Sequence, residues 1–74
     1  EDDDTTLRAR CGYAMALYKD DGATLDDLHK AVTTVEDVAQ TARRVLGGAH
    51  PTTEWIERSL QEAQAALRVR ETSV

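Results

Sequence analysis

The chain has 74 residues, of which 41% are apolar and 4% aromatic, with no phenylalanine, so it forms at most one small domain with a thin aliphatic core. Its net charge of −5 is concentrated in residues 1–37, where ten acidic and four basic side chains leave −6, and this argues against nucleic acid as a partner. A single cysteine excludes an internal disulfide, and no apolar run reaches the ~20 residues that cross a bilayer, so we expect a cytoplasmic protein with no membrane partner.

The first predicted helix follows an acidic end. Residues 1–4 are all acidic, and we expect them to be disordered. A helix is predicted over residues 5–19, where Asp4 or Thr5 can cap the free N–H groups. Gly12 lowers helix propensity by about 1 kcal/mol relative to alanine, and we expect the close approach of a neighbouring helix to be the reason. Apolar side chains recur at spacings of three and four, at Leu7, Cys11, Ala14 and Leu17 or Tyr18.

The second predicted helix covers residues 24–46 and has the clearest apolar pattern. The turn before it contains Gly22, which can adopt a positive φ, and Thr24 can cap the helix together with Asp27. Three positions in seven are apolar, which is the width of a helix packed between two neighbours. The apolar stripe consists of Leu25, Leu28, Val32, Val35, Ala39, Ala42 and Leu46, widened by Ala31, Val38 and Val45.

The third predicted helix covers residues 51–70 and begins after a sharp corner. Gly47 can end the preceding helix in the left-handed conformation, and Pro51 suits a first helical turn. His50 can cap the new helix with a ring nitrogen. We expect residues 72–74 to form a frayed tail. The apolar stripe of this helix contains Ile56, Leu60, Ala63 and Leu67, with Trp55 beside it.

The corner resembles the turn between repeats in tetratricopeptide (TPR) proteins of the kinesin light chain type. In those proteins a helix ending in Val-Leu-Gly is followed by His-Pro-x-Thr and a new helix, and here the same letters occupy residues 45–53. The resemblance to this family also covers residues 7–10 and residues 16–18, together with Gly22 in the turn that follows. Placing residues 50–53 over residues 3–6 gives an internal offset of 47 residues (50 − 3).

The resemblance implies an all-α fold of three antiparallel helices. Residues 5–71 would form one TPR-like unit, a helix pair followed by a C-terminal capping helix, and adjacent repeats of a longer parent chain would flank it. The family lines a peptide groove with paired asparagines, whereas this chain contains none. The equivalent positions lie near Cys11 and Gly12, and at Arg58 and Ser59. The resemblance therefore implies the helical architecture of the family rather than its asparagine-based recognition of peptides.

The function implied by the resemblance is a non-catalytic protein–protein interaction scaffold with a protein or peptide partner. Side chains of the first helix would form its binding face, with Arg8, Met15 and Lys19 as the candidates. We expect no enzyme, because catalysis by Cys11 with a histidine would need an orienting group and an oxyanion site, and no nucleophile elbow or glycine-rich loop supplies them. No cofactor or metal is expected either, since Asp26 and His29 would supply only two ligands.

Two alternatives remain open. The 3.5-residue period of residues 25–46 also suits a self-associating bundle or coiled coil, in which this helix pairs with a second copy. The last four residues match the Thr-x-Val-carboxylate ligand of PDZ domains, with Thr72 and Val74 as the recognised side chains. Under that alternative the tail alone would carry the function.

Overall fold

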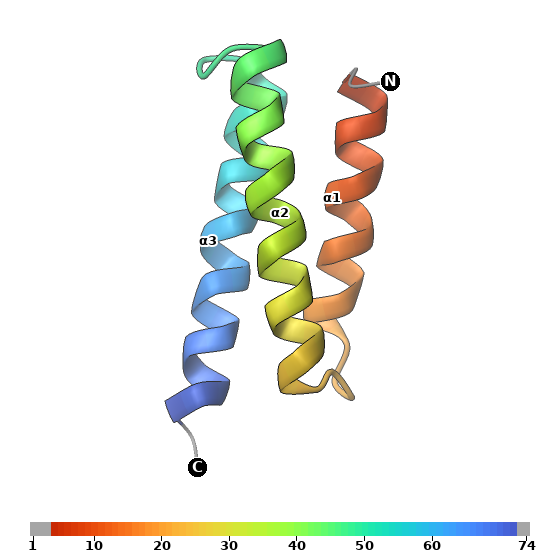
Figure 1. Ribbon diagram of the computed structural model, residues 1–74, viewed down its shortest axis with the longest axis vertical. Helices are drawn as coiled ribbons and strands as arrows, with labels where there is room; N and C mark the ends of the chain where they lie inside the picture. Colours follow the sequence, from red (N-terminus) through yellow and green to blue (C-terminus); the bar gives the residue numbers. More distant parts are fainter. Residues whose placement is uncertain (1–3, 73–74) are drawn as a thin grey trace.

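Three α-helices form the computed structural model, which describes residues 4–72 (Figure 1). Helix α1 spans Asp4–Lys19, α2 spans Leu25–Val45 and α3 spans Pro51–Thr72. Helices α1 and α3 run in the same direction and α2 runs against both (Figure 1), and α2 contacts each neighbour more extensively than α1 contacts α3. The expectation of an all-α fold with three antiparallel helices is confirmed.

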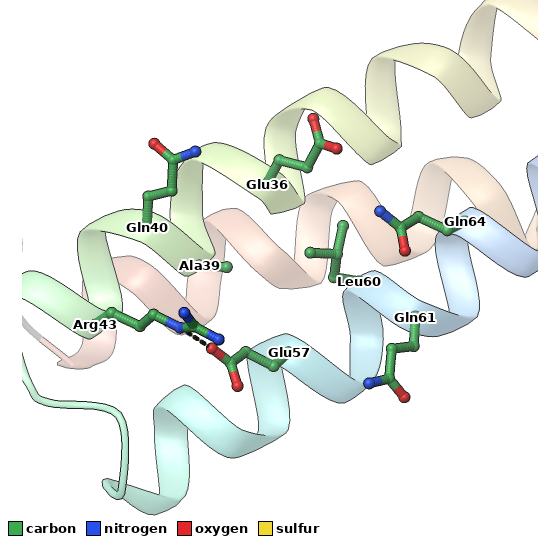
Figure 2. A pocket seen from close by; sticks show the side chains of 8 residues that line it. All are labelled: Glu36, Ala39, Gln40, Arg43, Glu57, Leu60, Gln61 and Gln64. Atoms are coloured by element: carbon green, nitrogen blue, oxygen red, sulfur yellow. Dashed lines mark hydrogen bonds and ion pairs between the residues drawn. The ribbon is translucent and has the colours of Figure 1, made fainter.

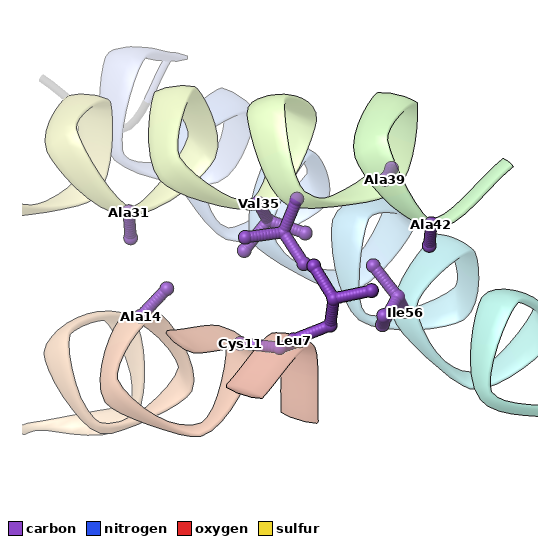
Figure 3. Packing of buried hydrophobic residues seen from close by; sticks show 9 residues of the cluster. Leu7, Cys11, Ala14, Ala31, Val35, Ala39, Ala42 and Ile56 are labelled. Atoms are coloured by element: carbon purple, nitrogen blue, oxygen red, sulfur yellow. The ribbon is translucent and has the colours of Figure 1, made fainter. Parts of the chain in front are cut away.

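The core is built mainly from small aliphatic side chains that all three helices contribute (Figure 3). Ala14 of α1 points toward Ala31 of α2, and these short side chains allow the two helices to approach closely. Leu7 and Ile56 are among the largest side chains with no exposed surface. The buried cluster consists of Leu7, Cys11, Ala14, Ala31, Val35, Val38, Ala39, Ala42 and Ile56.

The ends of the α2 stripe are more exposed than the sequence predicts. Leu25 is 43% exposed and Val45 is 48% exposed, although both were assigned to the buried face. A pattern with a strict seven-residue period drifts by about 20° per heptad on a straight helix. This drift moves Leu25 and Val45 toward the edge of the stripe, whereas Leu46 still packs against the core.

Helices α1 and α3 extend beyond their predicted ranges, and α2 is one residue shorter at each end than predicted. Helix α1 begins at Asp4 rather than at Thr5. The Asp4 Oδ1 atom accepts a hydrogen bond from Thr52 Oγ1 at 2.7 Å. Asp4 is therefore part of the folded unit and joins the starts of α1 and α3. Helix α3 continues to Thr72, whose hydroxyl donates to the Arg68 carbonyl at 3.0 Å. The rest of the expected acidic end and frayed tail lies outside the described residues.

The predicted caps of α2 and α3 are confirmed, whereas Asp4 and Thr5 lie within α1. The Asp27 N–H donates to Thr24 Oγ1 at 3.1 Å and the Thr24 N–H donates to an Asp27 carboxylate oxygen at 3.1 Å, which completes a capping box. At the start of α3 the Thr52 N–H donates to His50 Nδ1 at 3.1 Å. These bonds satisfy N–H groups that have no partner within their own helix.

The glycines behave differently in the two turns. Gly47 has φ +94° and ends α2 in the left-handed region, as expected. The expectation of a positive φ at Gly22 is wrong, because among residues 4–72 only Gly47 has one. The Gly22 N–H instead donates to Asp20 Oδ1 at 2.9 Å, so the side chain of Asp20 closes this turn.

The predicted close approach at Gly12 is also wrong. Gly12 is exposed, and a Cβ atom placed on it would meet no other atom within 4 Å. We therefore expect Gly12→Ala to stabilise the chain by about 1 kcal/mol, because alanine has the higher helix propensity. Thermal denaturation followed by circular dichroism should show a rise in Tm of roughly 4–8 °C. Ala9→Gly, at another exposed position of α1, should lower Tm by a similar amount; an unchanged Tm in both variants would contradict this reasoning.

Candidate functional site

A groove of about 520 Å³ lies between α2 and α3 (Figure 2). Its apolar base consists of Ala39, which is almost completely buried, and Leu60, which packs against the core. Six polar side chains surround this base. Those from α2 are Glu36, Gln40 and Arg43, and those from α3 are Glu57, Gln61 and Gln64.

The groove follows from the same spacing on both helices. Residues 36, 39, 40 and 43 of α2 are at positions i, i+3, i+4 and i+7, and residues 57, 60, 61 and 64 of α3 repeat that spacing. Positions three and four apart share one helix face. The methyl side chain of Ala39 leaves a hollow in this face that a larger residue would fill.

An ion pair closes one end of the groove. The Arg43 Nε atom donates a hydrogen bond to Glu57 Oε2 (Figure 2). This hydrogen bond and the charge of Glu57 hold the pKa of Arg43 above its ordinary value. An exposed pair of this kind contributes little to stability, but it neutralises both charges and fixes two side chains at the end of the groove.

The other four polar side chains of the groove form neither hydrogen bonds nor ion pairs within the described part of the chain. Glu36, Gln40, Gln61 and Gln64 have no hydrogen-bond or ion-pair partner within residues 4–72. Their exposed polar atoms are therefore available to a partner that enters the groove. Polar groups around an apolar base are the usual composition of a protein-binding surface.

The three residues proposed from the sequence lie on α1, away from this groove. The Arg8 guanidinium lies 5.6 Å from the centre of the Trp55 ring, at a distance that suits a cation–π contact. Met15 is half-buried, and its sulfur accepts a weak hydrogen bond from Ser59 Oγ at 3.5 Å. Lys19 is exposed at the end of α1. Arg8 and Met15 thus contact α3, while Arg8 and Lys19 are both exposed.

A tyrosine also links α1 to α3. The Tyr18 hydroxyl donates to Glu62 Oε1 at 3.0 Å. Burial, followed by the hydrogen bond and the negative charge of Glu62, raises the pKa of Tyr18 to about 12. The unfolded chain releases this proton at a lower pH than the native chain does. The contribution of the protonated hydroxyl to stability is therefore fully present below the pKa of the unfolded chain and is lost as pH rises through the pKa of the folded chain.

We expect this contribution of Tyr18 to be fully present below pH ~10, the ordinary tyrosine pKa, and to be lost as pH rises to about 12. Urea denaturation at a series of pH values from 8 to 12 measures the decline in the free energy of unfolding. Tyr18→Phe should reduce this decline, because the ionising group is gone. Tyr13→Phe, which changes a tyrosine that is 61% exposed on the same helix, should leave the decline unchanged. Equal pH profiles in wild type and Tyr18→Phe would contradict the expectation.

The remaining candidates from the sequence do not form a reactive site in the described residues. Cys11 is fully buried, and burial raises the pKa of its thiol. His29 lies 3.5 Å from Glu71 Oε2, and no group of three His, Cys, Asp or Glu side chains within residues 4–72 can hold a metal ion. Thr72 is helical, and Val74 lies outside the described residues.

The groove residues were not identified from the sequence. The signal that was available is the repeated spacing of polar residues beside the apolar stripe on two consecutive helices.

No helix within residues 4–72 is both long and apolar enough to cross a membrane. Comparison with known proteins gave no match to any family model, curated protein or solved structure.

Proposed function

We propose that the chain is a non-catalytic protein–protein interaction scaffold, and that it is a fragment of a cytoplasmic TPR-like helical repeat protein. The groove between α2 and α3 is the observation that carries this proposal. It combines an apolar base with four polar side chains that have no partner within residues 4–72. A segment of a protein partner can bury apolar surface on such a base and bond to the surrounding side chains.

The contacts between α1 and α3 support the repeat part of the proposal. Within residues 4–72, four of the pairs that join these two parallel helices are separated along the chain by 48, 47, 44 and 44 residues. These values are close to the 47-residue offset at which the sequence resembles itself. Equivalent positions of successive repeats lie side by side in a helical solenoid. The four pairs are Asp4–Thr52, Arg8–Trp55, Met15–Ser59 and Tyr18–Glu62.

The burial of the α2 stripe favours the scaffold over the self-associating alternative. Leu28, Val35 and Val38 are at most 2% exposed within the single chain. Little of this stripe is therefore free to pair with a second copy. The helical conformation of Thr72 likewise does not favour the PDZ-ligand alternative, because such ligands bind as an added strand.

Affinity capture with matched variants tests the proposed function. The chain is immobilised, and the proteins that it retains from a cell extract are quantified by mass spectrometry. Gln64→Trp fills the groove, and Arg58→Trp introduces the same side chain at an exposed position of α3 outside the groove. We expect Gln64→Trp, but not Arg58→Trp, to reduce retention of a partner by about tenfold, the effect of losing ~1.4 kcal/mol of binding free energy.

Two further variants separate this proposal from the other surfaces. Lys19→Glu tests the face of α1, and removal of residues 72–74 tests the tail. If a partner is lost only on removal of the tail, the chain is a PDZ-type ligand and the scaffold proposal is wrong. If no retained protein depends on the groove or on α1, the proposal also fails. Circular dichroism of each variant confirms that the helices are intact.

A further inference from the structure

We propose that the groove between α2 and α3 binds an arginine side chain of the protein partner, with Glu36 as the residue that pairs with its charge. This inference rests on the proposed scaffold function and specifies the chemistry of its partner. The observations that carry it are the charge balance of the groove, the acceptors around it and its apolar base.

The charge balance favours a cation. Two carboxylates and one guanidinium line the groove, which leaves one net negative charge (−2 + 1 = −1). Arg43 and Glu57 pair with each other, so the uncompensated charge belongs to Glu36. An anionic side chain placed here would meet Glu36 without a free cation among the lining residues, whereas a cationic side chain completes the balance.

The acceptors around Glu36 suit a guanidinium in particular. Gln40 follows Glu36 by one helical turn, which places their Cβ atoms about 5–6 Å apart, and Gln64 lies across from Glu36 on α3 (Figure 2). Carboxylate and amide oxygens accept hydrogen bonds, and a guanidinium presents five N–H donors in a planar arrangement. Lysine offers three donors on a more strongly hydrated ammonium group, so it satisfies fewer of these acceptors.

The apolar base suits the rest of the arginine side chain. Ala39 and Leu60 form a surface on which three methylene groups can be buried, and the charged head can remain at the polar edge. The ion pair between Arg43 and Glu57 limits the groove at one end. The head of a bound arginine is therefore directed toward Glu36, away from the guanidinium of Arg43.

A titration followed by NMR tests this inference directly. The probe is a blocked alanine–arginine–alanine tripeptide added to the ¹⁵N-labelled 74-residue chain. Counterparts carry citrulline, lysine or glutamate in place of arginine, and citrulline keeps the shape without the charge. We expect saturable shifts of the side-chain amide signals of Gln40 and Gln64 with the arginine probe. Binding of the citrulline probe should be weaker by about fivefold, the upper range for an exposed ion pair.

Matched charge variants identify the anchor. Glu36→Gln should weaken binding of the arginine probe by about fivefold. Glu54→Gln, an equal charge change on α3 outside the groove, should change the affinity for this probe by less than about twofold. Absence of saturable shifts at the groove overturns the inference, as does equal weakening by the two variants. If capture of a partner depends on Gln64→Trp but not on Glu36→Gln, the scaffold function stands and the arginine inference fails.

Discussion

Ile56→Ala is expected to lower the free energy of unfolding by about 2–5 kcal/mol, the cost of deleting a buried branched side chain and leaving a cavity. Ile56 has no exposed surface, and it extends from α3 toward Leu7 of α1 and Ala42 of α2 (Figure 3). A chain of this size has a total stability of roughly 4–11 kcal/mol. The substitution therefore removes a large share of it.

The measurement is urea denaturation of wild type and variants, followed by circular dichroism. Ile56→Val serves as the matched control, because it deletes one methyl group and should cost only about 0.5–1.5 kcal/mol. The order wild type, valine, alanine is the expected result. Similar stability of the two variants, within about 0.5 kcal/mol of wild type, would mean that Ile56 is not packed between the other two helices.

Gly47→Ala is expected to cost about 1–2 kcal/mol, because φ at this residue is +94° and a Cβ atom is disfavoured at positive φ. The Gly47 N–H donates to the carbonyls of Ala42 and Arg43, both at 3.2 Å. Its conformation ends α2 and starts the turn that returns the chain as α3. Strain at Gly47 therefore disturbs the packing of α2 against α3. The groove between these two helices changes with it.

Gly48→Ala is the control for this prediction. A Cβ atom on Gly48 would also meet nothing within 4 Å, and its φ is not in the positive region. Its substitution should be neutral or stabilising by up to about 1 kcal/mol, because alanine restricts the unfolded chain. Thermal denaturation of the two variants side by side measures the difference. Equal Tm values would contradict the left-handed conformation of Gly47.

The helices could be predicted from the sequence because their signals are local. The capping pair Thr24 and Asp27 marks the start of α2, and Gly47 and Pro51 mark the corner after it. Each signal involves residues within a few positions of one another, and the structure confirms it. Leu25 could not be assigned correctly in this way, because its exposure depends on how the apolar pattern drifts around the whole length of α2.

The candidate site was harder to predict because it depends on distances between helices. Gly12 was expected to allow close packing, but which face of α1 meets α2 is set by Leu7, Cys11 and Ala14, and Gly12 lies outside that face. The groove arises because Ala39 and Leu60 meet across two helices whose relative position the sequence does not specify. Met15 was expected on a binding face, whereas the structure places its sulfur against Ser59.

The structure buries the α2 stripe within the three helices of a single chain, and we propose that this chain presents the α2–α3 groove to a partner. Sedimentation equilibrium over a wide concentration range, with helix content measured by circular dichroism on the same samples, tests it most directly. We expect a monomer of 8.2 kDa whose helicity does not change with concentration. Dimerisation with helicity that rises with concentration would show that the stripe is buried between chains instead, and would contradict the account.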